Sequence, residues 1–492
     1  MSSTGTEVCD IETDINVSGE KAYPTSIDLE MGVGVFVKAA VNYIPDSMEE
    51  AEVQAVDLSS SDVMNMLGDK QKKVLKEARS KPDSQFELKV KSDSGGDKLH
   101  VKFNAFTQSP FIGYSPYNVA LGASLLDEYA VIDTARFGIY DSVFRDSTQV
   151  KRVGPSLEDC EYDIPQLIVR IAEEMIKQAD RMRSWTDPNL SEADKKAKQM
   201  QHQLNKEYVL PKLKEVFGRS HLDELKNSIS KLANRAQIDM NICETITRHL
   251  NGNTGSFITT IMNLCDEFQA IFTPQLNWPE VQYIIKSKEE VMNDATPIQL
   301  PIQSLSATVA SDAGVFPGKY AVCELPLPAS TQLGQPSNSV MVHPADNMTP
   351  GASAYPVAAP SWLGLVAIPV KTEKDGAPTR KDEGFTSHQE APDKTKDSYK
   401  KVGQDTTAIL ENWVKTFYKW TALGACTCIV NCPMNVQVEP GKRYEVQNMN
   451  GETLFKGFAY HVAYSLKTGS GSSNSATVNI SFSHVEFGNF NL

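Results

Sequence analysis

The sequence predicts an α+β protein in which two β-barrel-like domains are joined by a helical block. Three observations indicate this fold class. Apolar and polar residues alternate, as in half-buried strands, over most of the first 160 residues and again after residue 274. Helical periodicity fills the stretch between them, and Gly and Pro separate the strand patterns. A chain of 492 residues is long enough for two to four domains, each with its own core.

The first segment, residues 1–160, is predicted to be a β-rich, barrel-like domain. Apolar residues alternate with polar ones in FELKV, from Phe86, and in LHVKFNA, from Leu99, so these runs should form a hairpin with one apolar face. A helix is expected from Asp62, where apolar residues recur at helical spacing. Residues 106–143 combine Gly, Pro and aromatic residues, as strands and tight turns do.

Residues 161–273 are predicted to form the helical block. Apolar residues keep helical spacing from Ile164 to Met182, with a proline in the first turn. Two further helices should start at Ser191 and Ser220, because an Asp three residues after each serine completes a capping pair. The last helix keeps a buried side through Phe272 and should end at the Thr-Pro pair that follows.

Two less regular segments come next. Residues 274–369 contain strand patterns at 281–287 and 320–328 and then a Pro-, Ser- and Gly-rich stretch, 328–360, which we expect to be a long surface loop. Residues 370–402 are poor in apolar residues and rich in both signs of charge. We expect them to be mobile, or ordered only against a partner.

Residues 403–492 are predicted to form a helix followed by a closing β-module. The helix, 405–423, places Trp413, Phe417 and Trp420 on one side. In FAYHVAYSL, the residues that alternate with small or polar neighbours are Phe458, Tyr460, Val462, Tyr464 and Leu466. The run TVNISF alternates likewise, and a glycine-rich loop joins the two strands as a hairpin. Each strand therefore has one face for a core.

Charge and composition exclude several classes of protein. A formal net charge of −14 and a pI near 5.2 argue against a broad surface for phosphate backbones, so we expect no nucleic-acid recognition. The N-terminus lacks the pattern of a secretory signal, and no run of about 18 apolar residues occurs, so no membrane span is expected. Eight cysteines are too sparse for a disulfide scaffold and are interpreted as thiols in a reducing cytoplasm.

Common signatures of catalysis and nucleotide binding are missing from the sequence. It contains no GxGxxG, GxxxxGK[ST], HExxH or GxSxG. Cys426, Cys428 and Cys432 fall on one side of a predicted strand, where a soft cation would need a fourth ligand such as His461. Buried thiols are the favoured interpretation, because structural zinc usually uses CxxC pairs. We therefore expect no catalytic residue, no cofactor and no metal.

Other polar and aromatic candidates are interpreted as structural. Solitary histidines such as His249 lack an evident partner, which a general base needs. Neighbouring acids, such as Asp127 with Glu128, do not face one another on a helix and should solvate an outer face. Trp413 and Trp420 share a helical stripe, which is typical of packing rather than of a sugar platform.

The closing module carries a family resemblance. A helix is followed by a strand ending in CPMNVQVEPGKRYEV, with a Pro-Gly turn at Pro440 and Gly441. A Gly-aromatic strand then runs from Gly457 through Tyr460, and a Thr-led strand begins at Thr477. This order resembles the closing module of baseplate hub proteins in contractile-tailed bacteriophages and related injection systems. The segment NTGSFITTIMNLCDEFQAIFTP is similar to a helix of that family, and the N-terminal hairpins fit its first barrel, so that about half of the chain is covered.

The resemblance implies a structural, non-enzymatic role. It implies a homotrimer in which two barrel-like domains per subunit build a ring-forming oligomer of pseudo-sixfold symmetry, an adaptor between the sixfold tail tube and the threefold spike. The implied partners are the tail tube protein, the spike protein and other baseplate proteins. The implied location is the tail baseplate of the virion, assembled in the host cytoplasm.

Two alternatives stay open at this stage. The same β-modules and the Pro-rich stretch would also suit another virion tail-tip or receptor-binding structural protein. A metal-dependent hydrolase would have to use the three cysteines near residue 430. The helices of 191–236 and the segment 370–401 extend beyond a minimal hub.

Overall fold

The structure is a computed structural model of the whole chain. It describes residues 9–45, 81–92, 97–115, 118–140, 163–181, 191–232, 235–252, 255–309, 320–325, 338–344, 354–358, 379–380, 385–388, 426–467 and 475–487, and single positions within 360–363 and 409–424. The helix expected from Asp62 lies outside these residues. Among the described helices, none is both long enough and apolar enough to cross a membrane.

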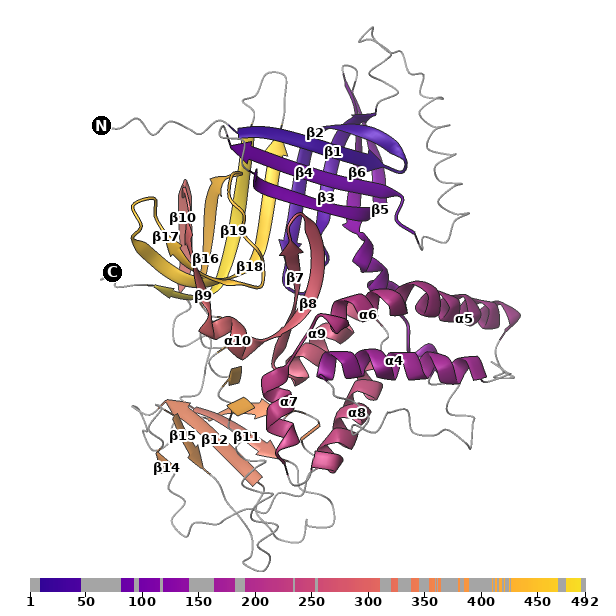
Figure 1. Cartoon of the computed structure of the whole chain (residues 1–492), viewed down its shortest axis with the longest axis vertical. Helices are drawn as coiled ribbons and strands as arrows, with labels where there is room; N and C mark the ends of the chain where they lie inside the picture. The colour runs from indigo at the N-terminus through magenta and orange to yellow at the C-terminus, as the bar shows by residue number, and fades with distance from the viewer. Residues whose placement is uncertain are drawn as a thin grey trace, which may run out of the picture.

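The α+β fold class is confirmed, and the N-terminal strands close into a barrel (Figure 1). Its order is β1-β4-β5-β6-β3-β2, and β2 pairs back with β1. The six strands are β1 (Cys9–Val17), β2 (Glu20–Gly32), β3 (Lys38–Pro45), β4 (Ser84–Ser92), β5 (Asp97–Ser115) and β6 (Asn118–Asp127). The expected hairpin is β4 with β5, and its apolar face is buried, with the rings of Phe86 and Phe103 stacked 4.9 Å apart.

A block of helices follows the barrel and lies on one side of it (Figure 1). Its elements are η1 (Glu128–Thr134), α4 (Ile164–Arg181), α5 (Glu192–Leu204), the π-helical turn η3 (Asn205–Val209), α6 (Leu210–Gly218), α7 (Asp223–Ser230), α8 (Arg235–Asn251) and α9 (Phe257–Glu267). The helix expected from Ile164 is confirmed. The cap at Ser191 is confirmed as well, because its hydroxyl accepts the Asp194 amide at 3.1 Å.

The cap predicted at Ser220 is wrong. Helix α7 begins after Leu222, without a side-chain cap. Ser220 is buried, donates its hydroxyl proton to the Val216 carbonyl at 2.9 Å and accepts the Ile285 amide at 2.8 Å. The Leu222 amide instead donates to the carboxylate of Asp163 at 2.7 Å. Asp163 lies 59 positions earlier in the sequence. Tertiary partners thus replace the local capping pair.

The helix predicted to continue to Phe272 ends at Glu267. Gln269 has a positive φ of 49°, which breaks the helix, and β7 (Ala270–Asn277) starts directly after it. β7 pairs with β8 (Glu280–Ser287), and α10 (Lys288–Asn293) follows. Phe272 is therefore a strand residue, and its ring stacks 5.4 Å from that of Tyr283. Its burial, which the helical pattern also predicted, comes from the hairpin.

The C-terminal strands form a second barrel-like unit. Its strands are β9 (Ala295–Gln299), β10 (Ser304–Val309), β16 (Cys426–Pro433), β17 (Arg443–Gln447), β18 (Thr453–Lys467) and β19 (Ser475–Phe487). β17, β18, β19 and β16 pair in that order, and the segment 295–309 bridges the two ends, because β9 pairs with β17 and β10 pairs with β16. In the link between them, the Leu300 amide donates to Gln447 at 3.0 Å and the Gln303 amide donates to Asn431 at 2.8 Å.

A separate sheet of five strands comes from the two less regular segments. Its order is β13 (Ala354–Ala358), β11 (Tyr320–Leu325), β12 (Asn338–Pro344), β15 (Phe385–His388) and β14 (Thr379–Arg380). β12 and β13 lie inside 328–360, so the expectation of one long surface loop there is wrong. β14 and β15 belong to the segment 370–402 and join the sheet through pairing of β15 with β12.

The helix expected over 405–423 agrees with the positions that the structure describes. Residues 409, 412, 413, 416, 417 and 420 are helical. The Trp413 ring stacks on Phe417 with centroids 5.6 Å apart, and the Trp420 ring lies 4.0 Å from that of His484. The shared tryptophan stripe is therefore a packing surface. One continuous hydrophobic core includes residues of both barrel units and of the helical block.

Candidate functional site

The residues that the sequence singles out gather near the junction between the two barrel units. β18 pairs with β17 through residues 453–458 and with β2 of the first barrel through residues 461–467. Between these two parts of β18, the Val33 amide donates to the Tyr460 carbonyl at 2.9 Å. Within the part that pairs with β2, the Ser465 hydroxyl donates to the Asp28 carboxylate at 2.6 Å. The two units are thus joined directly by main-chain hydrogen bonds, in addition to their contacts through the helical block.

The Pro-Gly turn is locked against the β7–β8 hairpin. Gly441 has a φ of +84°, which suits the third position of a type II turn with proline before it. A Cβ atom there would lie 2.1 Å from Oγ1 of Thr273. The Thr273 hydroxyl donates to the Pro440 carbonyl at 3.1 Å, and the Gly441 amide donates to Ala459 of β18 at 2.8 Å. Only glycine fits this position.

Gly457 and Thr477 occupy the strands next to the turn. A Cβ atom on Gly457 would lie 3.2 Å from both the Phe455 ring and the Phe482 Cβ, so the missing side chain lets two aromatic residues pack closely. Thr477 is half-buried on β19 and pairs with Ser465 and Pro433. Both residues serve packing and register in the described structure.

Tyr460 does not point into the core as its alternation predicts. The register of β18 against β19 shifts between Ala459 and His461, which is the mark of a β-bulge. Phe458 and Val462 on either side are buried, whereas Tyr460 is 39% exposed. The prediction for Tyr460 is wrong because one extra residue turns its side chain to the opposite face.

Two other tyrosines of the junction are buried and hold the segment that leads into the turn. The Tyr464 hydroxyl accepts the Val438 amide and donates to the Val436 carbonyl, each at 3.2 Å. The Tyr444 hydroxyl accepts the Glu439 amide at 3.0 Å. Burial raises the pKa of both phenols, so both remain protonated near neutral pH.

The cysteine group is part of the core. Cys428 and Cys432 are buried on β16, and burial raises the pKa of their thiols to about 11 and about 12. Thiols of this kind are protonated at neutral pH. Within the described part of the chain, no three His, Cys, Asp or Glu side chains are arranged to hold a metal ion. The prediction of buried structural thiols is confirmed for these two cysteines.

One acid predicted to solvate an outer face is instead buried. Asp127 is 1% exposed and accepts the Tyr129 amide at 2.7 Å, which caps η1. Burial raises the pKa of this carboxyl well above its usual range. The prediction for Asp127 is wrong because its carboxylate is buried where it caps the first turn of η1.

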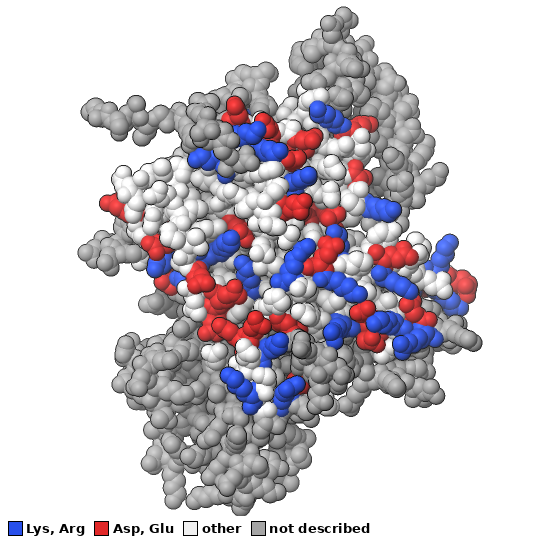
Figure 2. Space-filling view, in the orientation of Figure 1, with Lys and Arg blue, Asp and Glu red and all other residues white. Residues whose placement is uncertain are grey.

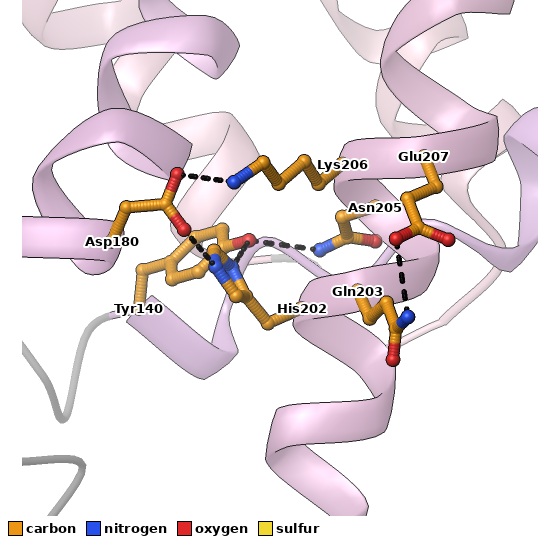
Figure 3. A network of polar contacts seen from close by, with 7 residues as sticks. All are labelled: Tyr140, Asp180, His202, Gln203, Asn205, Lys206 and Glu207. Atoms are coloured by element: carbon orange, nitrogen blue, oxygen red, sulfur yellow. Dashed lines mark hydrogen bonds and ion pairs between the residues drawn. The ribbon is translucent and has the colours of Figure 1, made fainter.

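A polar network in the helical block resembles a catalytic arrangement in its residue types (Figure 3). The Tyr140 hydroxyl lies 2.9 Å from Nδ1 of His202, Nε2 of His202 lies 2.9 Å from Asp180, and Asp180 also binds Lys206 at 2.8 Å. Asn205, at the π-helical turn, donates to the Tyr140 hydroxyl at 3.3 Å. Sequence reasoning missed this network, because its members are spread over 66 positions and follow no motif.

The buried part of this network has a structural role. Tyr140 and Asn205 are fully buried, so no substrate reaches the phenol or the amide. Burial raises the pKa of Tyr140, which keeps the hydroxyl protonated. The bonds connect α4, α5 and the π-helical turn, whose irregular backbone needs such partners. The network therefore fixes the angle at which α5 passes into α6.

Comparisons with known proteins give matches only among solved structures. No family model matches the chain, and no curated protein matches it. The 43 kDa tail protein of prophage MuSo2 from Shewanella oneidensis has a TM-score of 0.41 and 8% identity, over 96% of this chain and 98% of that one. A tail protein from Neisseria meningitidis MC58 has a TM-score of 0.41 and 9% identity, over 96% of each chain.

A third solved structure is of the same kind. Prophage tail protein gp18 from Listeria monocytogenes EGD-e has a TM-score of 0.36 and 8% identity, over 96% of this chain and 94% of that one. All three solved structures are described as tail proteins.

Proposed function

We propose that this chain is a structural hub protein of a bacteriophage tail baseplate. Three copies form a ring of six barrel units, which joins the sixfold tail tube to the threefold spike and contacts other baseplate proteins in the virion. The observation that carries this proposal is the strand pairing of 461–467 with 26–32, which holds two barrel units of one subunit side by side.

Two barrel units per chain suit a hub, which must join a sixfold tail tube to a threefold spike. A closed ring of three subunits repeats every contact three times, and two similar units per subunit give six similar positions around the axis. Direct strand pairing suits this task, because main-chain hydrogen bonds fix both distance and register between the units. The work is geometric and needs no catalytic pocket.

The second barrel unit offers an edge for contacts between subunits. Among the described strands, β10 pairs only with β16, and residues 304–308 are exposed. Leu305 of β10 is 43% exposed, and Ile429 of the neighbouring strand β16, on the opposite face of the sheet, is 50% exposed. An unpaired strand edge with exposed apolar residues readily adds to another chain. In the proposed ring, this edge contacts the first barrel of the next subunit.

Light scattering coupled to size-exclusion chromatography tests this proposal. The full chain should have a mass three times the 54.2 kDa of one copy. Each interface of such a trimer should bury more than about 1,000 Å² of surface. Substituting Leu305→Lys together with Ile429→Lys should give monomers, because each charge would have to be buried. Met200→Lys on α5, where the methionine is 57% exposed, is the matched control and should leave the trimer intact. A monomeric wild-type chain at micromolar concentration contradicts the proposal.

A further inference from the structure

The two barrel units share one plan of strand pairing. In the first unit β4, β5, β6, β3 and β2 pair in that order, and in the second unit β17, β18, β19, β16 and β10 do so. Each of these pairings is antiparallel, and the strands follow one another along the chain in the same order in both units. β1 and β9 lie outside the shared plan, because β1 runs antiparallel to β4 whereas β9 runs parallel to β17. β10 therefore corresponds to β2, and β18 corresponds to β5.

The registers align the two units residue by residue. The hairpin of β5 with β6 closes on Ser115 opposite Asn118, and the hairpin of β18 with β19 closes on Lys467 opposite Ser475. Ser115 thus corresponds to Lys467, and the first residue of β6 corresponds to the first residue of β19.

The same alignment continues across both sheets. Leu125 and Phe482 are the eighth residues of β6 and β19. From Leu125 the strand pairs lead through β3 to Leu29 of β2. From Phe482 they lead through β16 to Ala307 of β10. Leu29 therefore corresponds to Ala307.

The stretch of β2 that corresponds to β10 is the one that joins the two units. Residues 304–309 of β10 correspond to 26–31 of β2, and this stretch of β2 pairs with β18. Ile27 is fully buried there, where it lies opposite a residue of β18. Leu305 has the equivalent position in β10 and is 43% exposed. β10 thus has the position of a strand paired on both sides, but β16 is its single partner among the described strands.

A complementary edge lies on β5 of the first unit. β18, the equivalent strand, pairs with β19 on one side and with both β17 and β2 on the other. β5 pairs with β4 along 97–105 and with β6 along 105–115. On the side of β4, residues 106–115 have no partner in the part of the chain that the structure describes. Six strands separate β5 from β10 in the sheet of one chain, so these two edges can pair only between copies (Figure 1).

Neither edge carries the charges that often protect an edge strand. β10 has the sequence SLSATV and its neighbour β16 has the sequence CTCIVNCP, so neither contains a charged residue. Residues 106–115, FTQSPFIGYS, contain none either. Figure 2 shows a largely uncharged surface over β10 and β16, whereas charged side chains are frequent over the helical block. Strand edges without such charges are suited to pairing with another chain.

We propose that β10 of one copy pairs antiparallel with β5 of the next copy, so that residues 304–308 lie opposite residues 111–115. This inference rests on the proposed ring and names the strands at its subunit contact. Ser304 lies opposite Ser115, because Ser26 lies opposite Lys467 in the corresponding contact within one chain. The proline of β5 precedes this stretch, at the bulge against β6. The contact between copies thus repeats the contact between units, and it covers Leu305 as β18 covers β2.

Cysteine cross-linking of the full chain tests the predicted register. The variant Ser304→Cys with Ser115→Cys is treated with a mild oxidant and run on a gel without reductant. Cβ atoms of directly opposite residues lie about 4.5–5.5 Å apart, which is close enough for a disulfide. We expect covalent species of two and three copies, several-fold above the level in the wild type and in each single variant. Reductant should return them to single chains.

A second pair of cysteines is the matched control. Gln108 lies on the same strand, about 23 Å from Ser115 along it, because seven residues separate the two positions. Ser304→Cys with Gln108→Cys should therefore give no more cross-linking than the single variants. No cross-link through residue 115, or an equal cross-link through residue 108, overturns the strand assignment.

Light scattering of the reduced variants separates this inference from the proposed function. A trimer that does not cross-link through residue 115 contradicts the strand assignment and leaves the hub proposal standing. A monomer that does not cross-link contradicts both. Cross-linked species that continue beyond three copies support the pairing of β10 with β5 but contradict a closed ring, because a head-to-tail contact that does not close gives filaments.

Discussion

At the scale of single residues, burial in the fold changes the acid–base behaviour of His484. Its side chain is buried on β19 beneath the Trp420 ring, and its Nε2 atom has no hydrogen-bond partner among the described residues. Burial lowers the pKa of His484 from 6.5 to about 4, and the positive charges of Arg443 and Lys288 act in the same direction. The imidazole is therefore neutral in the folded protein at pH 5 to 7.

This shift predicts a loss of stability in mild acid. Between pH 6.5 and pH 4 the unfolded chain binds a proton at His484 that the folded chain does not, so the free energy of unfolding falls as the pH falls. From pH 7 to pH 5 the contribution of this one residue is about 2 kcal/mol. His484→Asn tolerates the positive φ of 54° and cannot titrate. From pH 7 to pH 5, the free energy of unfolding of the wild-type protein should therefore fall by about 2 kcal/mol more than that of the variant. Equal pH slopes in urea denaturation of the two proteins would refute this assignment.

At the scale of elements, period and turn signals predicted strands such as β4, β5 and β18 and the helix α4. Local patterns failed where a distant partner decides the outcome. The alternation in β4 and β5 and the helical spacing of α4 depend on one buried face, and both are confirmed. Ser220 has the sequence of a cap but bonds β8, 65 positions away. Tyr460 follows the alternation, but a bulge reverses it, and the register that places the bulge is set by β19.

The site itself could be predicted only in part. Pro440 and Gly441 were found from the sequence because a Pro-Gly turn has a local conformational cause. The pairing of β18 with β2 joins residues more than 400 positions apart and leaves no local signal.

The Pro-Gly turn gives a prediction at the scale of an element. Gly441→Ala combines a positive φ with a Cβ atom 2.1 Å from Oγ1 of Thr273, so we expect it to lower the free energy of unfolding by about 3 kcal/mol or more. Gly19→Ala is the matched control, because Gly19 has a φ of +89° but no atom within 4 Å of the new Cβ. That change should cost about 1 kcal/mol. Equal losses in chemical denaturation would show that Thr273 does not lock the turn.

At the scale of the whole molecule, two barrel units are held side by side by β2 and β18, and the helical block shares their core (Figure 1). One chain therefore carries two barrel units that share a hydrophobic core. Its proposed activity is the shape of the assembly, so variants that break contacts between subunits should abolish function while each copy stays folded. Strand β10, which pairs only with β16 among the described strands, is the place where that separation can be made.

Electron microscopy of the purified full chain measures this shape directly. If the chain is a hub, class averages should show a closed ring with threefold symmetry and six barrel-sized densities around a central channel, two from each copy. Isolated particles of one copy, or a ring in which the two barrel units of a copy do not both face the channel, would contradict the proposed function.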